Sequence, residues 1–332
     1  MMKYKSLLIV CLFVSFCLIT PLFLTAPEAE AGITGHWWYV GGNGPGNYTT
    51  IQDAVDNASA GDTVFVYHGL YHERITVNTS IFLIAESRQA IIDGEGLGSC
   101  PVRIFADAVT FSGFTVLNNE SDLAMGSILV EASDCHILNT FASSTSSGDY
   151  GILLISAEGV VVEGNTVNHH VFGIALFQAN HCTVMNNTLT GDNEGIELYM
   201  SQDNLLQNNS ITNNNEDGII VFDSNTNTIT GNEIKSSTRY GIFFQYLYNG
   251  SAGNVITKNT FQGNGHDAFF FNGQGKNTWQ GNYWHRYLKV PKLIIGRRAV
   301  LTIPAVPFHF PGFTIFIPWV AIDWHPSKIP PA

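Results

Sequence analysis

The chain has 332 residues, of which 45% are hydrophobic and only 13% are charged, and its formal net charge is −12. The hydrophobic share excludes a disordered chain. The negative charge excludes a duplex nucleic-acid binder held mainly by phosphate contacts. Neutral glycans, cations and proteins remain as partner classes.

The N-terminus has the organisation of an export signal. Lys3 and Lys5 precede an apolar run at residues 7–24, and a small-residue cleavage pattern follows at residues 29–31. This order predicts a signal peptide over residues 1–31. The run is also long enough for an uncleaved membrane anchor, but the cleavage pattern favours removal. We therefore expect a secreted, extracellular or cell-surface protein, or one in a periplasm-like space, with membrane contact only through this segment if it is retained.

The exported part carries few cysteines and many glycosylation motifs. Three cysteines remain after the signal, an odd number far apart, so no disulfide framework is predicted. Asn-x-Ser/Thr motifs predict a glycoprotein wherever the host has the machinery; they lie at Asn47, Asn57, Asn78, Asn119, Asn186, Asn208 and Asn249.

A short amphipathic helix is expected near the start of the exported chain. Its apolar residues follow helical spacing at Ile51, Ala54, Val55 and Ala58. Thr50 and Asp53 form an N-terminal capping pattern, and Gly61 would end the helix. Because a repeat-built core needs its ends covered, we expect this helix to close the N-terminal end.

The central part is an internal repeat. Six related segments begin 22 to 27 residues apart, at Gly151, Gly173, Gly195, Gly218, Gly241 and Ala268. Each contains short alternating apolar runs that are too short for helices. The period also suits leucine-rich repeats, but their Leu-x-x-Leu-x-Leu spacing is absent.

One repeat cannot fold alone. Burying about four aliphatic side chains contributes roughly 6–12 kcal/mol, whereas ordering about 22 residues costs roughly 1–2 kcal/mol for each backbone unit. Stacked coils can fold because their strands pair and their apolar columns merge. The sequence therefore predicts an all-β, single-stranded parallel β-helix. An inward asparagine column would then form a structural ladder of stacked amides at Asn165, Asn187, Asn209, Asn232, Asn259 and Asn282.

The C-terminal segment differs from the repeats. Five basic residues fall within residues 286–298, and residues 299–322 are then almost wholly apolar. Four prolines in that stretch would break a membrane-spanning helix. We expect an irregular apolar tail that closes the last coil or lies along an outer face. The predicted organisation is a signal at 1–31, a β-helix domain at 32–284 and a capping tail at 285–332.

The motifs also resemble a known family. The segments "YTTIQDAVDNASAGDTVFVYHGLYHERITVNTSIFLIAE", "AIIDGEG" and "VTFSGFTV", followed by the Gly-Ile coils, resemble NosD-like proteins of the carbohydrate-binding and sugar-hydrolase branch of the pectin-lyase-like superfamily. The resemblance covers about residues 38–284, and the ending is similar to archaeal cell-surface members. It implies a right-handed β-helix, and for NosD proteins copper handling for nitrous oxide reductase. Copper is disfavoured here because the chain has five methionines and no His/Met/Cys cluster.

Acidic residues are the candidate catalytic groups. The residues before each repeat start predict one exposed column: Tyr150, Phe172, Glu194, Asp217, Tyr240 and Asp267. Glu194 and Asp217 would lie one coil apart, about 4.8 Å by strand spacing, with Glu197 beside them. Such a group could share a proton, bind a cation such as Ca²⁺ or serve a retaining glycosidase. Arg239 is the basic candidate for a lyase. The alternative is a solvated acidic turn.

Aromatic residues are the candidate sugar-binding groups. Outward strand positions are predicted to carry Phe177, Tyr199, Phe222, Phe243 and Phe270 in register, and Tyr240 lies in the acidic column. Phe177, Tyr199, Phe222 and Tyr240 are therefore the predicted carbohydrate-binding residues, unless the apolar tail covers the rings. His169, His170 and His181 could bind a transition metal, but solvated loop histidines are the simpler interpretation.

These observations favour an exported β-helix protein that acts as a carbohydrate-binding or structural module, with a polysaccharide or surface glycan as partner. One alternative is a polysaccharide lyase or glycoside hydrolase that uses Glu194, Glu197 and Asp217. The second alternative is a NosD-like copper-handling accessory protein. Whether the chain is an enzyme, and which metal it would use, stay open at this point.

Overall fold

The computed structural model describes residues 35–94, 100–118, 126–144, 150–246, 251–271, 277–285, 292–303 and 313–331. The predicted signal at 1–31 and the sequons at Asn119 and Asn249 lie outside these residues. Residues 35–332 form one compact unit. None of the helices in the described ranges has the length and apolar character needed to cross a bilayer.

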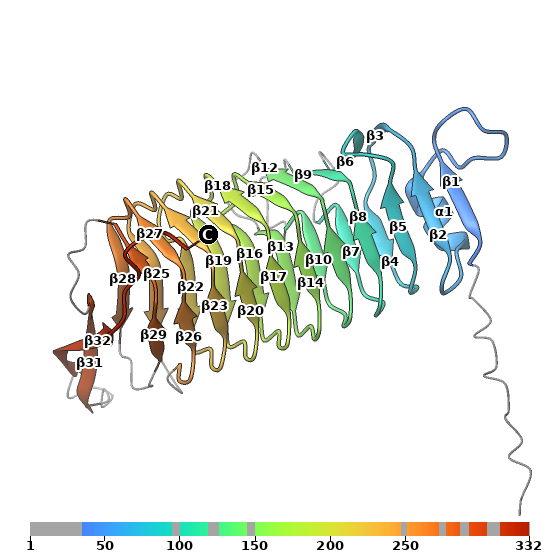
Figure 1. Ribbon diagram of the computed structural model, residues 1–332. Helices are drawn as coiled ribbons and strands as arrows, with labels where there is room; N and C mark the ends of the chain where they lie inside the picture. The colour runs from blue at the N-terminus through green and yellow to red at the C-terminus, as the bar shows by residue number, and fades with distance from the viewer. Residues whose placement is uncertain are drawn as a thin grey trace, which may run out of the picture. The chain divides into compact units, whose positions relative to one another are not determined.

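This unit is a parallel β-helix whose coils stack into three sheets (Figure 1). Sheet I contains β1 (Trp37–Val40), β2 (Thr63–Val66), β5 (Phe82–Ala85), β8 (Thr110–Ser112), β11 (His136–Leu138), β14 (Val161–Glu163), β17 (Thr183–Met185), β20 (Leu205–Gln207), β23 (Thr228–Thr230), β26 (Val255–Thr257) and β29 (Thr278–Gln280). Sheet II contains β3 (Gly69–Tyr71), β6 (Ala90–Asp93), β9 (Thr115–Asn118), β12 (Phe141–Ser144), β15 (Thr166–Asn168), β18 (Thr188–Thr190), β21 (Ser210–Thr212), β24 (Glu233–Lys235), β27 (Thr260–Gln262) and β30 (Tyr283–Trp284).

Sheet III contains the strands that begin each repeat. They are β4 (Ile75–Val77), β7 (Val102–Ile104), β10 (Ile128–Val130), β13 (Tyr150–Ile155), β16 (Phe172–Phe177), β19 (Glu194–Tyr199), β22 (Ile219–Phe222), β25 (Tyr240–Gln245), β28 (His266–Phe271), β31 (Lys292–Ile303) and β32 (Phe313–Asp323). The predicted apolar columns are in register: Ile152 pairs with Ile174, and Ile174 with Ile196, all fully buried. The prediction of a stacked β-helix is confirmed.

Glycine precedes the isoleucine of the repeat strands because the coils approach too closely there for a side chain. A Cβ on Gly173 would lie 2.7 Å from the carbonyl oxygen of Gly195 and 2.8 Å from Asp192 Oδ2. A Cβ on Gly195 would lie 2.5 Å from the Gly218 carbonyl oxygen and 2.7 Å from Asn214 Nδ2. The Gly-Ile motif therefore marks the corner between sheets II and III, where the next coil presses on the backbone.

The asparagine column forms a continuous hydrogen-bonded ladder. Asn187 Oδ1 accepts from both the backbone N (2.9 Å) and Nδ2 (3.0 Å) of Asn165. Asn187 Nδ2 donates to the carbonyl of Val162 (2.9 Å) and to Oδ1 of Asn209 (3.0 Å). The same pattern continues to Asn282, so each amide is satisfied by the coils on either side.

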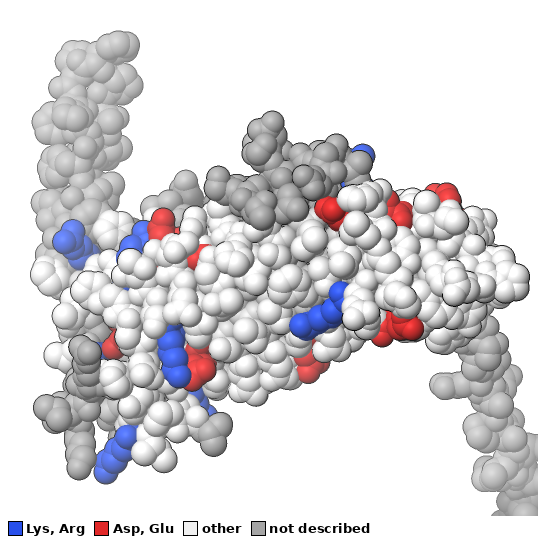
Figure 2. All heavy atoms as spheres, turned by 90° about the horizontal axis from the view of Figure 1, so that it is seen from above, with Lys and Arg blue, Asp and Glu red and all other residues white. Residues whose placement is uncertain are grey.

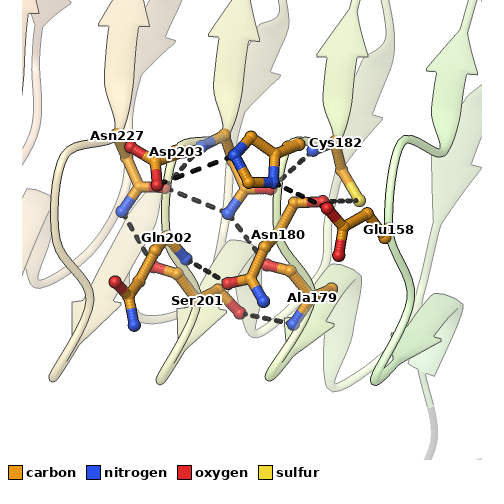
Figure 3. A network of polar contacts seen from close by, with 10 residues as sticks. Glu158, Ala179, Asn180, Cys182, Ser201, Gln202, Asp203 and Asn227 are labelled. Atoms are coloured by element: carbon orange, nitrogen blue, oxygen red, sulfur yellow. Dashed lines mark hydrogen bonds and ion pairs between the residues drawn. The ribbon is translucent and has the colours of Figure 1, made fainter.

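A second polar ladder lies at the turn between sheets III and I (Figure 3). Asn227 Oδ1 accepts from the backbone N of Asn204 at 2.9 Å. Beside it, Ser201 Oγ accepts from the backbone N of Ala179 at 3.1 Å, as Figure 3 shows. These turns are therefore held by uncharged side chains that replace the backbone partners lost between strands.

The N-terminal helix α1 (Ile51–Asn57) forms where it was predicted, but it ends at Asn57 with Ala58 as its C-cap, before Gly61. The hydroxyl of Thr50 accepts from the backbone N of Asp53 at 3.3 Å. Both oxygens of Glu73 also accept from the first helical turn, at 2.8 and 2.9 Å. The helix packs on β1, β2 and β4 at the N-terminal end of the solenoid, with Ile51 buried at the contact.

The C-terminal tail is more regular than the sequence predicted. β31 and β32 form an antiparallel hairpin, and β31 pairs with β28, so the hairpin extends sheet III. Pro318 is tolerated in β32 because that strand is the last in its sheet. Asp323 Oδ2 ends the asparagine ladder by accepting from the backbone N (3.2 Å) and Nδ2 (3.1 Å) of Asn282. The described part of the tail therefore closes the last coil instead of lying along a face.

Candidate functional site

The outer face of sheet III presents three parallel columns of side chains between the core positions. The first column contains Tyr150, Phe172, Glu194, Tyr240 and His266. The second contains Leu129, Leu153, Ala175, Glu197, Ile220, Phe243 and Phe269. The third contains Ile155, Phe177, Tyr199, Phe222, Gln245 and Phe271. Most of these side chains are apolar, so the ionisable side chains among them are the candidates for a functional role.

The register of the last coil differs from the sequence prediction by one residue. Tyr240 lies opposite His266, not Asp267, and Ile242 lies opposite Ala268. The sixth repeat lacks the Gly-Ile pair that aligned the others, and a one-residue slip turns a side chain to the other face of a sheet.

The predicted row of outward aromatic residues is wrong at two positions: at Phe270 because of this slip, and at Phe243 because Gln245 holds the third-column position in that coil. Phe270 points into the core and is 7% exposed, and Phe243 belongs to the second column.

The three aromatic residues of the third column stack on one another. The ring centroids of Phe177 and Tyr199 are 4.5 Å apart and those of Tyr199 and Phe222 are 4.7 Å apart, with interplanar angles of 19° and 17°. Both faces of the Tyr199 ring are therefore covered by its neighbours. Stacking on a sugar ring needs a free aromatic face, so this column contributes mainly to holding the coils together.

Asp217 and Glu194 share the guanidinium of Arg239. Arg239 Nε donates to Asp217 Oδ1 at 2.9 Å, and Nη2 donates to Asp217 Oδ2. The same Nη2 lies 3.4 Å from Glu194 Oε1 and 3.3 Å from Glu216 Oε2. The position between the carboxyls that the sequence suggested for a shared proton or a cation is thus held by an arginine.

The prediction of an exposed acidic column is wrong for the two carboxyls at its centre. Asp217 is fully buried and Glu194 is 7% exposed. Burial, with the nearby charge of Asp217, raises the pKa of Glu194 to about 9, so Glu194 holds a proton at neutral pH. Burial also raises the pKa of Asp217, and its hydrogen bonds from Arg239 offset part of the rise.

Glu197 lies in the apolar second column, between Ala175 and Ile220. It is 8% exposed, and burial raises its pKa to about 7. Among the described residues, its Oε2 atom has no hydrogen-bond partner. Glu197 is therefore a carboxyl that exchanges a proton near neutrality and has an unused acceptor.

A cavity of about 220 Å³ lies where β25 and β28 meet the hairpin. Its lining is mixed aromatic, charged and aliphatic: Tyr240, His266, Asp267, Ala268, Phe269, Lys292, Leu293, Ile294 and Ile295. Lys292 Nζ lies 3.7 Å from Asp267 Oδ2. The Arg239 guanidinium lies 5.7 Å from the centroid of the Tyr240 ring, so the cavity adjoins the carboxyl cluster. The sequence marked Tyr240, but Lys292 and the other hairpin residues join it only in the folded chain.

The three candidate histidines are not brought together. His170 is buried, with Nε2 at 3.0 Å from Ser127 Oγ and Nδ1 at 3.7 Å from Asp192 Oδ1. These three residues resemble a catalytic triad in type, but their complete burial leaves no access for a substrate. His181 lies on the turn towards sheet I, with Nδ1 at 3.0 Å from Glu158 Oε1.

The fold defines the chain as a pectate-lyase-like right-handed parallel β-helix. A solved pectate lyase, Pel9A, matches with a TM-score of 0.60 and 14% identity, over 76% of this chain and 80% of that chain. The periplasmic alginate epimerase AlgG matches with a TM-score of 0.43 and 12% identity, over 65% and 62%. A DFA-IIIase from Arthrobacter chlorophenolicus A6 matches with a TM-score of 0.46 and 14% identity, over 68% of each chain.

Within this fold class, the chain belongs to the NosD family. The family model described as "Periplasmic copper-binding protein (NosD)" matches residues 55–289, so the resemblance seen in the sequence is confirmed. No curated protein matches the chain.

The described residues do not fit a copper site. No group of three or more His, Cys, Asp or Glu within the described ranges is arranged to hold a metal ion. Cys100, Cys135 and Cys182 are buried and form no disulfide with one another, and burial raises the pKa of the Cys182 thiol to about 11. Since the thiolate is the metal-binding form, no copper chemistry is derived from these residues.

Proposed function

We propose that the protein binds a polysaccharide or surface glycan on the outer face of sheet III, with one sugar unit in the cavity lined by Tyr240. The observation that carries this proposal is the composition of that cavity. It combines the aromatic side chains of Tyr240 and Phe269 with the hydrogen-bonding groups of Asp267, His266 and Lys292. Aromatic surface for sugar C–H groups beside polar groups for hydroxyls is the chemistry that saccharide recognition requires.

Size and charge support an uncharged glycan. At about 220 Å³, the cavity is smaller than the roughly 300–1,000 Å³ of drug-sized sites, which suits one ring of a longer chain. Asp267 is paired with Lys292, and Asp217 with Arg239. Because these charges are already paired within the protein, a ligand needs no charge of its own to balance them, and a neutral glycan fits.

The proposed location is the exported side of the membrane, as a secreted or cell-surface protein or one in a periplasm-like space. The NosD family is described as periplasmic, which supports export. The basic and apolar order of residues 1–31 points the same way.

The test is binding of the full chain to an array of neutral and acidic glycans, followed by calorimetry on the best ligand. Tyr240→Ala and Lys292→Ala should each weaken binding by about tenfold or more, because each removes a group from the cavity. Phe82→Ala is the matched control: it removes an exposed aromatic ring from sheet I, away from the proposed binding face, and should leave the affinity unchanged. No bound glycan, or full affinity in Tyr240→Ala, would refute the proposal.

A second candidate function is a polysaccharide lyase or glycoside hydrolase. The observation that favours it is a pair of carboxyls on one strand with different proton affinities: Glu194 with a pKa of about 9 and Glu197 with a pKa of about 7. Glu194 could then donate a proton and Glu197 accept one, while Asp217 positions Arg239. The test is turnover of neutral and acidic polysaccharides; activity that survives in Glu197→Gln excludes this role.

A further inference from the structure

We propose that the C-terminal end of the solenoid docks onto an anionic membrane surface through the β31–β32 hairpin. This inference goes beyond the glycan proposal, although Leu293 and Ile295 also line the proposed glycan cavity. It rests on the charge distribution, on the exposed apolar residues of the hairpin and on the strand pairing of its outer half.

Charge is strongly separated along the chain. Residues 268–332 contain seven Lys and Arg and one Asp, a formal charge of +6, whereas residues 1–267 contain eight Lys and Arg and 26 Asp and Glu, a charge of −18. The one acid of the C-terminal part, Asp323, is buried under the last coil. In Figure 2, more of the visible Lys and Arg side chains lie on the half of the molecule that carries β31 and β32 than on the other half.

The same end exposes large apolar side chains. Leu293 and Ile295 alternate along β31 and lie opposite Ile322 and Val320 of β32, so these residues share one face of the hairpin. Leu293 is 53% exposed, Ile295 61% and Val320 49%. Trp324, just after β32, is 62% exposed. Contiguous exposed apolar surface of this kind marks an interaction site.

The outer half of the hairpin extends beyond its neighbouring strand. The last pairing of β31 with β28 is at Arg297, whereas its pairing with β32 continues to Ile303. Among the described residues, no third strand pairs with residues 298–303 and 313–317, and a two-stranded ribbon is marginally stable in water by itself. No Asp, Glu, Lys or Arg occurs between residues 299 and 322. An apolar medium would supply the stability that the ribbon lacks.

A bilayer accounts for both features, because it offers negative headgroups directly above an apolar layer. If a second copy of the chain covered the apolar residues with its own hairpin, the two basic C-terminal ends would face each other and repel. The hairpin with Arg297 and Lys328 is therefore assigned to an anionic lipid surface. Trp324 has the amphipathic side chain that is favoured at the membrane–water interface.

The first experiment measures binding of the full chain to phosphatidylglycerol–phosphatidylcholine vesicles and to phosphatidylcholine vesicles by flotation. Binding should need phosphatidylglycerol and weaken with salt. Removing a basic residue should lower the partition coefficient about fivefold for each charge, so Arg297→Gln with Lys328→Gln should lower it roughly 25-fold. Lys258→Gln, which removes an exposed cation from the acidic coils, is the matched control and should bind no less tightly than the native chain.

A local readout separates the hairpin from any contribution of residues 1–34. Brominated phosphatidylglycerol should quench the fluorescence of Trp324, and the quenched fraction should fall in Trp324→Phe but not in Trp37→Phe. Equal quenching in both variants, or equal binding of the double variant and the native chain, would overturn the proposal. A dimer in light scattering that Val320→Ser dissociates would assign the face to a second copy instead.

Discussion

The asparagine ladder and the carboxyl of Glu197 are both buried polar features, but they differ in whether all of their polar atoms form hydrogen bonds. In the asparagine ladder, Asn209 accepts from Asn187 and donates to Val184 and Asn232, and all partners are within 3.0 Å. On the outer face of sheet III, Glu197 is also buried, at 8% exposed against 1% for Asn209, yet its Oε2 has no hydrogen-bond partner among the described residues. The ladder uses its whole hydrogen-bonding capacity for stability, whereas the carboxyl keeps capacity for a ligand or a proton.

The difference teaches how to separate structural from functional polar residues in a solenoid. Stacked amides are uncharged and satisfy one another in every coil, so they can be repeated without limit. Stacked carboxyls repel, and here a single arginine neutralises the stack at Glu194 and Asp217. The candidate site is therefore marked by the positions where the residue type changes between coils, and not by the asparagines that recur in every coil.

The largest expected effect is loss of one rung of the ladder. Asn209→Ala removes two bonds accepted from Asn187 and two donated bonds, and leaves buried groups unpaired. The free energy of unfolding should fall by about 3–5 kcal/mol in urea denaturation. Gln202→Ala, at an exposed turn position nearby, should change it by less than about 0.5 kcal/mol. Similar values for both variants would show that the ladder is dispensable.

The next effect concerns the ion pair. Arg239→Met leaves the fully buried Asp217 without its partner and should lower the free energy of unfolding by about 2–4 kcal/mol, measured in urea. The arginine side chain is 44% exposed, so water offsets part of the loss. Adding Asp217→Asn removes the buried charge and should restore more than half of the stability. If the double variant loses as much free energy of unfolding as Arg239→Met and Asp217→Asn lose separately when added together, the two residues are not coupled.

The third effect, similar in size to the second, depends on pH and tests Glu197. Its folded-state pKa of about 7 lies above the unfolded value of 4.5. Between these values the folded state retains a proton that the unfolded state releases, so stability falls as pH rises from 4.5 to 7 and stays low above 7. The loss is about 3 kcal/mol. In Glu197→Gln this contribution should vanish.

Urea unfolding at pH 5 and pH 8 measures this difference for the native chain and the variant. Glu131→Gln, at an exposed position in an earlier coil, is the matched control and should retain the native pH dependence. An unchanged difference in Glu197→Gln would mean that Glu197 is solvated in the folded protein.

Much of the fold could be predicted from the sequence, because the recurring Gly-Ile pair indicates how consecutive coils align. The columns beginning at Ile152 and Asn165 recur wherever Gly-Ile recurs, and both form as expected. The prediction slipped by one residue where that marker is missing, at Ala268. The tail was predicted to be irregular because its prolines argue against a helix, and they do not exclude an edge strand.

The sequence by itself determined the architecture: a period of about 22 residues with glycine at one corner and asparagine at another permits one way of stacking. It also marked the carboxyls and Tyr240 as candidates. Only the tertiary structure decided their chemistry. The burial of the carboxyls, the contact of Arg239 with Glu194 two coils away and the position of Lys292 beside Asp267 all depend on contacts between residues distant in the sequence. The raised pKa of a buried carboxyl and the shape of a cavity depend on residues from several coils, so a local sequence pattern cannot predict them.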